Sequence, residues 1–217
     1  MVASPFSQPA PGRGQMWRGL RIGLLGGSFN PAHAGHRAIS LHALKALRLD
    51  QVWWLVSPQN PLKSRQGMAA LPERLTGARQ TAAHPRIVAT ALESQLGTRY
   101  TAQTLRALIL AFPRTRFVWL MGADNLAQIR HWKNWPQIFL RTPIAVFNRS
   151  PYCRQGLQGL AALRFRRFRI PVRAAAGLAR RTPPGWVFFP APLHPASATA
   201  LRAARGQTAL QPPAHPA

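Results

Sequence analysis

The chain has 217 residues, and its 29 Lys and Arg residues far outnumber its 4 Asp and Glu residues, which gives a formal net charge of +25. Its hydrophobic fraction of 47% is enough for a globular core, and no apolar run approaches the roughly 18 residues that would cross a bilayer. Its one cysteine, Cys153, excludes an internal disulfide and a multi-cysteine metal site. We therefore expect a cytoplasmic protein with no membrane partner.

The positive charge is spread along the whole chain. Nearly all of the basic residues are arginine, and the lysines are Lys45, Lys63 and Lys133. An even spread of arginine is more typical of a biased composition than of a nucleic-acid footprint, which would be clustered and carried by a recognisable module. We expect no specific nucleic-acid partner. The densest cluster, residues 164–169, interleaves Arg with Phe, so a basic nucleic-acid-binding protein remains an alternative.

The ends of the chain lack the periodicity of helices or strands. The first residues mix Pro, Ser, Gly and Gln, a composition that is typical of a flexible segment. We expect flexible tails over residues 1–18 and 207–217, with one folded domain over residues 19–206.

Within that domain, apolar runs of strand length alternate with helical patterns. A first strand at 21–25 leads into a Gly-rich turn and a helix over 34–47. The later strands and helices are expected, in chain order, at 52–56, 71–83, 86–90, 101–111, 117–121 and 143–147. This alternation predicts an α/β fold, a Rossmann-like parallel sheet with helices on both faces and a ligand site beyond the carboxyl ends of the strands. Residues 149–184 give no clear pattern.

The segment from Gly26 to His36 follows the first strand and is the most informative part of the chain. Two adjacent glycines, Gly26 and Gly27, would let the backbone turn tightly and approach a phosphate closely. His33 and His36 are three residues apart, which places both rings on one side of a starting helix, near its partly positive end. Each feature alone has an ordinary structural explanation, but together they predict a phosphate-binding site.

This segment resembles the (G)GxFDPxHxGH signature of the nucleotidyltransferase superfamily, whose members transfer AMP or CMP from nucleoside triphosphates. The resemblance implies that Ser28 and Phe29 also contact ATP. Asn30 stands where the signature usually has Asp, so it keeps a short polar side chain but lacks the negative charge.

A second, weaker resemblance lies near the C-terminus, where residues 196–202 are similar to the ISSTxIR-like stretch of the superfamily. Ser197 and Thr199 keep hydroxyl groups that can cap the next helix. Arg202 keeps a guanidinium that can bind phosphates in a bidentate manner. By this resemblance the three residues complete the ATP site.

Further segments resemble the bacterial nicotinate-nucleotide adenylyltransferases in particular. Residues 99–105 are similar to their S/R-Y-T-x-x-T-L stretch, residues 122–126 to their G-x-D-x-L segment, and residues 60–63 to a loop that carries a basic residue. The nicotinate-nucleotide site that this resemblance implies consists of Asn30, Lys63, Tyr100, Thr101, Asp124 and Trp132. Taken alone, Thr101 and Asp124 are as well explained by helix capping, and Trp132 by core packing.

The resemblance implies that AMP is transferred from ATP to nicotinate mononucleotide, giving deamido-NAD and pyrophosphate. Its catalytic residues would be His33, His36, Lys63 and Arg202, with Mg²⁺ bound to ATP and no metal held by the protein alone. A homo-oligomer is compatible with the sequence. The alternative within the same class is another adenylyltransferase such as the pantetheine-phosphate type, which usually carries Thr at the position of His33.

Overall fold

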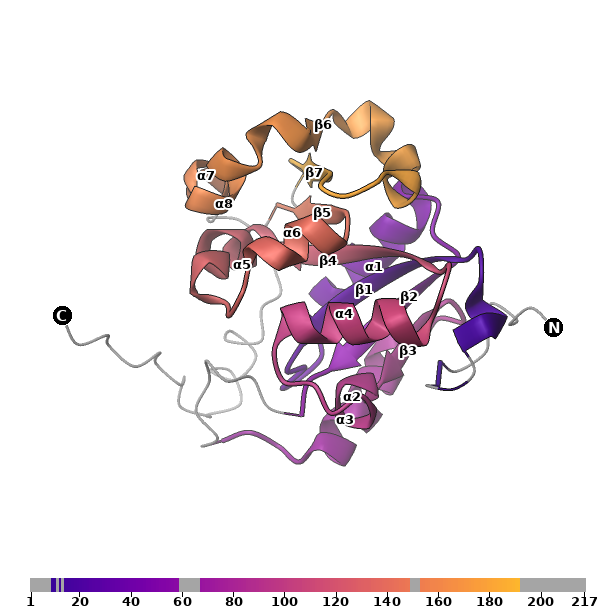
Figure 1. Cartoon of the computed structure of the whole chain (residues 1–217). Coiled ribbons are helices and arrows are strands. Elements are labelled where there is room, and N and C mark those ends of the chain that lie inside the picture. Colours follow the sequence, from indigo (N-terminus) through magenta and orange to yellow (C-terminus); the bar gives the residue numbers. More distant parts are fainter. Residues whose placement is uncertain (1–8, 11, 13, 59–66, 149–152, 192–217) are drawn as a thin grey trace.

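The structure, a computed structural model, describes residues 9, 10, 12, 14–58, 67–148 and 153–191. Within them, seven strands form one sheet in the order β3-β2-β1-β4-β5-β7-β6, and every neighbouring pair is parallel (Figure 1). The strands are β1 (Arg21–Gly27), β2 (Gln51–Val56), β3 (Ile87–Thr90), β4 (Arg116–Gly122), β5 (Ile144–Phe147), β6 (Arg169–Ile170) and β7 (Trp186–Phe189). The predicted parallel sheet is confirmed.

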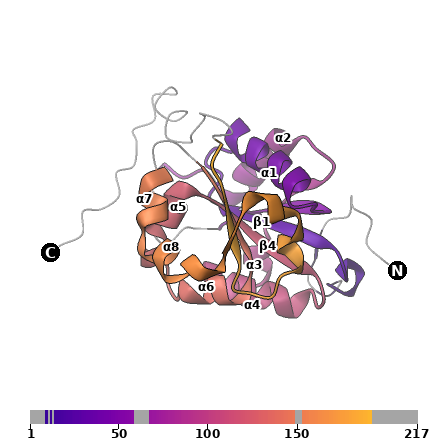
Figure 2. The ribbon, with the colours of Figure 1, turned by 90° about the horizontal axis from the view of Figure 1, so that it is seen from above.

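Helices cover both faces of the sheet, as Figure 2 shows for α1 and α2 on one side and α4 and α6 on the other. The first face is covered by α1 (Ala34–Ala46), α2 (Leu71–Ala82) and the 3₁₀ helix η4 (Val172–Arg180). The second is covered by α3 (Leu92–Gln95), α4 (Thr101–Ala111), α5 (Ala123–Gln128), α6 (Pro136–Arg141), α7 (Cys153–Gln158) and α8 (Leu160–Arg164). Short 3₁₀ helices lie at Gly14–Trp17 (η1), Ile129–His131 (η2) and Arg166–Phe168 (η3). None of the helices in the described ranges is both long and apolar enough to span a membrane.

The elements that the sequence predicted are present within one or two residues of their expected bounds, and α4 has the predicted bounds. The sequence did not predict β7, although all of its residues are buried between β5 and β6. Four apolar residues between proline-containing loops have no periodicity that could distinguish a strand from a loop.

The N-terminal boundary differs from the expected one. Residues Gly14–Trp17 form η1, and the Trp17 side chain is only 1% exposed. Its ring packs edge-on against Trp53 of β2, with 4.9 Å between the ring centroids. The tail expected over residues 1–18 was therefore too long, because burial of a large aromatic ring holds its last residues on the sheet. Residues 207–217 lie outside the described part of the chain.

The order of the strands determines where a ligand can bind. From β1 the chain continues to β2 and β3 on one side, whereas β4 and β5 extend the sheet on the other side. The pairing of β1 with β4 ends at Leu25 and Leu120, while β1 stays paired with β2 as far as Gly27 and Val56. In doubly wound sheets the ligand binds at such a switch point, beyond the carboxyl ends of the strands.

Candidate active site

The two histidines of the Gly-rich segment form the start of α1, next to the switch point. His33 is the N-cap residue, and its Nδ1 accepts a hydrogen bond from the backbone N–H of Gly35 at 3.1 Å. The Nδ1 of His36 accepts one from the backbone N–H of His33 at 3.2 Å, and the ring centroids are 3.8 Å apart. A ring nitrogen that accepts carries no proton, so each neutral ring holds its proton on Nε2.

Aromatic packing fixes the orientation of the His36 ring. Its centroid lies 4.7 Å from that of Phe29, and Phe29 in turn stacks on Trp54 at 5.1 Å. The indole N–H of Trp54 donates to the hydroxyl of Ser40 at 2.7 Å, and that hydroxyl donates to the His36 carbonyl at 2.8 Å. The Phe29 side chain is 2% exposed, so a contact between Phe29 and ATP would have to come from its backbone.

The two glycines have a different local role from the one that the sequence suggested. Both belong to β1, and the residue with left-handed backbone geometry is Phe29, with φ of 49°. A Cβ atom on Gly26 would lie 2.5 Å from Cη2 of Trp119, whereas one on Gly27 would make an ordinary contact with the Phe29 ring. The expectation of a tight turn at the glycines is corrected: the turn follows them, and Gly26 is required by the packing of Trp119.

Asn30 links the turn after β1 to the segment before α2. Its side-chain amide donates to the carbonyl of Gly67 at 3.0 Å and accepts from the backbone N–H of Ala69 at 3.3 Å. A carboxylate in this position could accept from Ala69 but could not donate to Gly67. The departure from the usual Asp therefore fits the backbone groups that surround it.

Three of the expected nicotinate-nucleotide residues, Tyr100, Thr101 and Asp124, lie at the starts of α4 and α5 on the second face of the sheet. Tyr100 is the N-cap residue of α4, and its ring lies 4.8 Å from the ammonium group of Lys133. Lys133 follows Trp132, which packs against the core and is partly buried. The structure thus brings the start of α4 close to the segment that contains Trp132. Asp124 lies in the first turn of α5, directly after β4.

Four predicted site residues, Lys63, Ser197, Thr199 and Arg202, lie outside the described residues. Their roles remain predictions. The half of the site that can be described consists of the carboxyl ends of β1 and β4 with the helices that follow them.

Sequence reasoning missed two buried ionisable residues beside this half-site, Arg74 of α2 and Glu93 of α3. They are 4% and 6% exposed. Burial raises the pKa of Glu93 to about 7, although hydrogen bonds from Thr104 and Ser57 act in the opposite direction. A signal was present for Arg74, because Ala78 and Ala82 follow it at helical spacing on the buried side of α2.

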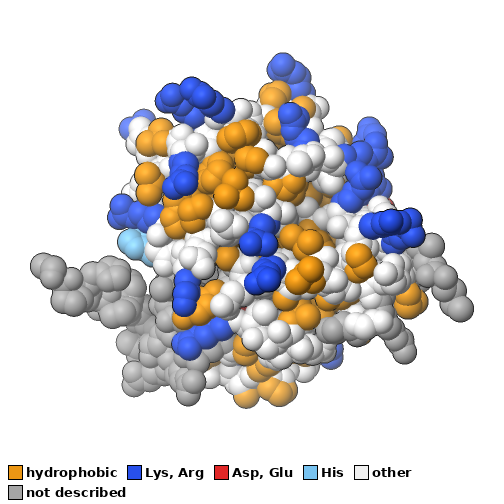
Figure 3. Space-filling model, viewed as in Figure 1, with side chains coloured by type: hydrophobic (Ala, Val, Ile, Leu, Met, Phe, Trp, Pro, Cys, Tyr) orange, Lys and Arg blue, Asp and Glu red, His pale blue; other side chains and the backbone are white. Residues whose placement is uncertain are grey.

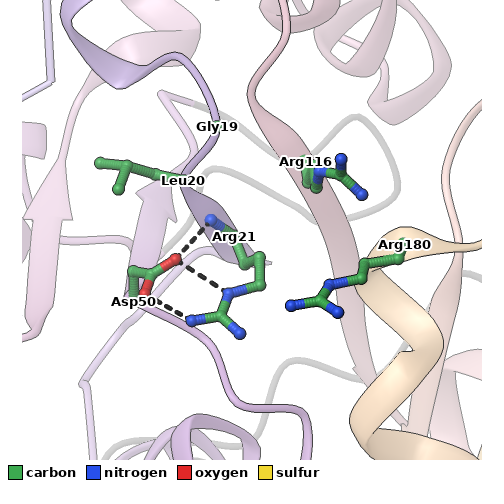
Figure 4. A pocket seen from close by; sticks show the side chains of 6 residues that line it. All are labelled: Gly19, Leu20, Arg21, Asp50, Arg116 and Arg180. Carbon is green, nitrogen blue, oxygen red and sulfur yellow. Dashed lines mark hydrogen bonds and ion pairs between the residues drawn. The ribbon is translucent and has the colours of Figure 1, made fainter. Parts of the chain in front are cut away.

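A pocket at the opposite edge of the sheet contains an ion pair between Asp50 and Arg21 (Figure 4). Arg21 donates to the carboxylate through its guanidinium, at 2.8 and 3.0 Å, and through its backbone N–H, at 2.7 Å. Burial acts to raise the pKa of Asp50, but these bonds outweigh it and hold the pKa below its ordinary value. Asp50 lies at the start of β2, so it is remote from the His33 end of the sheet.

Comparison with known proteins agrees with this geometry. The family described as cytidylyltransferase-like matches residues 24–204. A Bradyrhizobium protein named as a probable nicotinate-nucleotide adenylyltransferase is 52% identical over 84% of this chain and 95% of its own length. A Gluconobacter oxydans protein with the same name is 53% identical over 84% of this chain and 94% of its own length. The chain belongs to the nicotinate-nucleotide adenylyltransferase family.

Solved structures with this family's name share the fold. Nicotinic acid mononucleotide adenylyltransferase of Plasmodium falciparum, in a complex with NaAD, superimposes with a TM-score of 0.64 at 15% identity, over 85% of this chain and 83% of its own. Within the described part of this nicotinate-nucleotide adenylyltransferase family member, no group of three or more His, Cys, Asp or Glu side chains is placed to hold a metal ion.

Proposed function

We propose that this protein transfers AMP from ATP to nicotinate mononucleotide, giving deamido-NAD and pyrophosphate. The observation that carries the proposal is identity of about half the residues with relatives named as nicotinate-nucleotide adenylyltransferases, over nearly their whole length. The structure adds a paired histidine site at the switch point of a parallel sheet, where such a reaction would take place.

The histidine pair would bind the triphosphate of ATP. Because the capping bonds use Nδ1 of both rings, the Nε2–H of His33 and of His36 is the donor that each ring can offer to phosphate oxygen. The N-terminus of the 13-residue helix α1 adds partial positive charge. We propose that the remaining ATP contacts come from Gly26, Gly27, Ser28, Phe29, Lys63, Ser197, Thr199 and Arg202.

Nicotinate mononucleotide would bind between the start of α4 and the segment after η2. Trp132 is partly buried, so its ring can still be covered by a pyridine ring, whereas Trp135 belongs to the core. Thr101 supplies a backbone amide in the first turn of α4. We propose that Tyr100, Asp124, Asn30 and Lys63 complete this side of the site.

The transfer needs no base from the protein, because a nucleotide monophosphate with a second pKa of about 6 is already largely dianionic at neutral pH. A phosphate oxygen of the mononucleotide attacks the α-phosphorus of ATP, the bond from that phosphorus to the bridging oxygen breaks, and pyrophosphate leaves with the electron pair. The enzyme would hold the two anions in line and stabilise the charge that develops on pyrophosphate. Mg²⁺ would enter bound to ATP as part of the substrate.

The direct test measures pyrophosphate release from ATP with nicotinate mononucleotide, nicotinamide mononucleotide and phosphopantetheine as separate acceptors, and identifies the product by mass. We expect turnover to be greatest with nicotinate mononucleotide, and we expect the Trp132→Ala variant to have a raised KM for it. Equal turnover of the nicotinate and nicotinamide nucleotides would leave the adenylyl transfer intact but remove the nicotinate assignment. Turnover of phosphopantetheine alone would show that the protein is an adenylyltransferase of the pantetheine-phosphate type.

The distribution of charge on the face in Figure 3 gives no argument for a further macromolecular partner. Basic side chains are scattered over the face in Figure 3 and are separated by apolar and neutral ones. We expect weak, salt-sensitive attraction to any polyanion rather than specific nucleic-acid binding. A cytoplasmic location and self-association stay expectations, and light scattering tests the second.

A further inference from the structure

The side chain of Arg74 joins the loops that follow β1 and β2. Its guanidinium donates to the carbonyls of Ser28 at 2.7 Å, Ser57 at 2.8 Å and Pro58 at 3.0 Å. Its Nε–H donates to the carbonyl of Ala69, next to the start of α2, at 2.8 Å. One side chain therefore ties together three segments at the carboxyl edge of the sheet.

The buried charge of Arg74 is compensated by hydrogen bonds to backbone carbonyls. Although the side chain is 4% exposed, no acidic residue within the described ranges forms an ion pair with it. Burial lowers its pKa, so the protein bears a cost for keeping a cation in this position. Carbonyl oxygens accept four hydrogen bonds from the guanidinium, and an apolar side chain would fill the same volume without that cost. The arrangement thus favours a role in local geometry over a role in overall stability.

The loop after β2 is also held in place by hydrogen bonds of Ser57. The backbone N–H of Ser57 donates to the carbonyl of Gly27 at 2.9 Å, and its hydroxyl hydrogen bonds with the buried carboxyl group of Glu93. Glu93 also accepts from the hydroxyl of Thr104, in α4, at 3.3 Å. The loop after β2 is therefore fixed to β1, to α2 and, through Glu93, to α4.

Arg74 fixes the loop after β1 where it leads into the expected triphosphate site. Ser28, whose carbonyl accepts from Arg74 at 2.7 Å, directly precedes the turn that ends in His33 and His36, and the carbonyls of Ser57 and Pro58 hold the same guanidinium at the end of β2. We propose that Arg74 is a positioning residue for ATP: it holds this turn against the end of β2, so that the N–H donors of the turn and the rings of His33 and His36 converge on the phosphates. This inference rests on the proposed adenylyl transfer.

Arginine is required for this role, because the four acceptors lie on three segments. The rigid guanidinium has five donors in a planar fork, whereas the ammonium of lysine is a single point with three. Arg74→Lys keeps the charge but cannot reach all four carbonyls, and Arg74→Met keeps most of the volume without the charge. Arg79 is the matched control, because it lies on the exposed side of the same helix.

The test compares kcat and KM for each substrate in the Arg74→Lys, Arg74→Met and Arg79→Lys proteins, with far-UV circular dichroism to confirm folding at the assay temperature. We expect Arg74→Lys to lower kcat/KM for ATP by roughly 10- to 100-fold, the usual effect of displacing a catalytic group by about 1 Å. The KM for nicotinate mononucleotide should change less than the KM for ATP, because most of its proposed contacts lie at the starts of α4 and α5 and after η2, and Arg79→Lys should resemble the wild type.

Chemical rescue provides a second measurement, which distinguishes a positioning role of Arg74 from a purely structural one. In folded Arg74→Ala protein, guanidinium at about 10–20 mM, far below denaturing concentrations, should restore part of kcat/KM for ATP, whereas the same concentration of KCl should not. The inference is wrong if folded Arg74→Lys keeps wild-type kcat/KM for ATP, if both substrates are affected equally, or if no Arg74 variant folds. Inactive wild-type protein would instead overturn the proposed function, and the inference with it.

Discussion

His33 and His36 bind the backbone of their shared turn through the same ring atom, Nδ1. This reciprocal capping box satisfies two N–H groups at the start of α1, and it fixes both tautomers at the same time. Capping and the proposed phosphate binding would therefore use opposite nitrogens of each ring, so that a substitution can remove one function and keep the other.

The first prediction uses this separation at His33. In His33→Asn a side-chain oxygen can still cap α1, but the Nε2–H donor is lost, whereas His33→Ala loses both. We expect turnover to fall at least about 10-fold in both variants, because both lack a donor to the developing charge. Only His33→Ala should also lose about 1 kcal/mol of unfolding free energy. Urea denaturation beside a steady-state assay makes the comparison, and wild-type turnover in His33→Asn would contradict it.

The second prediction concerns Glu93 and pH. Its pKa rises from 4.5 to about 7 on folding, so over that interval the unfolded chain has lost a proton that the folded protein keeps. The contribution of Glu93 to the free energy of unfolding is therefore greatest below pH 4.5 and is lost as the pH rises through about 7. The total loss is about 3 kcal/mol.

The measurement is the free energy of unfolding of wild type and Glu93→Gln at about pH 5 and about pH 8. We expect the wild type to lose more stability than Glu93→Gln between these values, because the amide does not titrate. Glu73→Gln is the control, since Glu73 is exposed in the first turn of α2. The same pH dependence in Glu93→Gln and wild type would show that the buried carboxyl is not responsible.

A third prediction separates the packing role of Gly26 from a role in phosphate binding. Gly26→Ala places a Cβ atom 2.5 Å from Trp119, and such overpacking costs about 1–3 kcal/mol. Trp119→Phe shortens the ring, so the double variant should recover part of the stability that Gly26→Ala loses. Gly27→Ala should cost less, because its Cβ meets only an ordinary contact. Additive effects in a double-mutant cycle would contradict this account.

A fourth prediction concerns the choice between acid and amide substrates. Lys133 is held over the Tyr100 ring at the start of α4, beside the proposed nicotinate mononucleotide site. We expect Lys133→Met to reduce the ratio of kcat/KM for nicotinate over nicotinamide mononucleotide by about 2- to 5-fold, and less at high salt, because the ammonium is exposed. Lys45→Met, in the last turn of α1, is the control. An unchanged ratio at low salt would exclude a contribution from Lys133.

The fifth prediction concerns the N-terminus. A chain that begins at Met16 keeps Trp17 and should fold and turn over as the full chain does. A chain that begins at Gly19 lacks this buried ring, whose loss from a core costs about 3–5 kcal/mol. Melting temperature and soluble yield compare the two, and equal stability would show that Trp17 adds nothing to the core.

The sequence by itself determined the features that depend on neighbouring residues. The spacing of His33 and His36 placed both rings at one helix start, and the helical pattern of residues 101–111 gave α4 its observed bounds. Alternating strands and helices were enough to predict a parallel sheet, because parallel neighbours need long crossover connections.

Only the tertiary structure decided which distant residues meet at the site. Arg74 binds carbonyls as far as 46 residues away, and Trp119 of β4 explains why residue 26 must be glycine. The helical spacing of Arg74, Ala78 and Ala82 can indicate that Arg74 lies on the buried side of α2. No local pattern shows which carbonyls its side chain reaches or which ring packs against Gly26. Secondary structure follows from interactions over a few residues, whereas positions in the core and the acceptors of a buried cation depend on how the whole sheet brings its loops together.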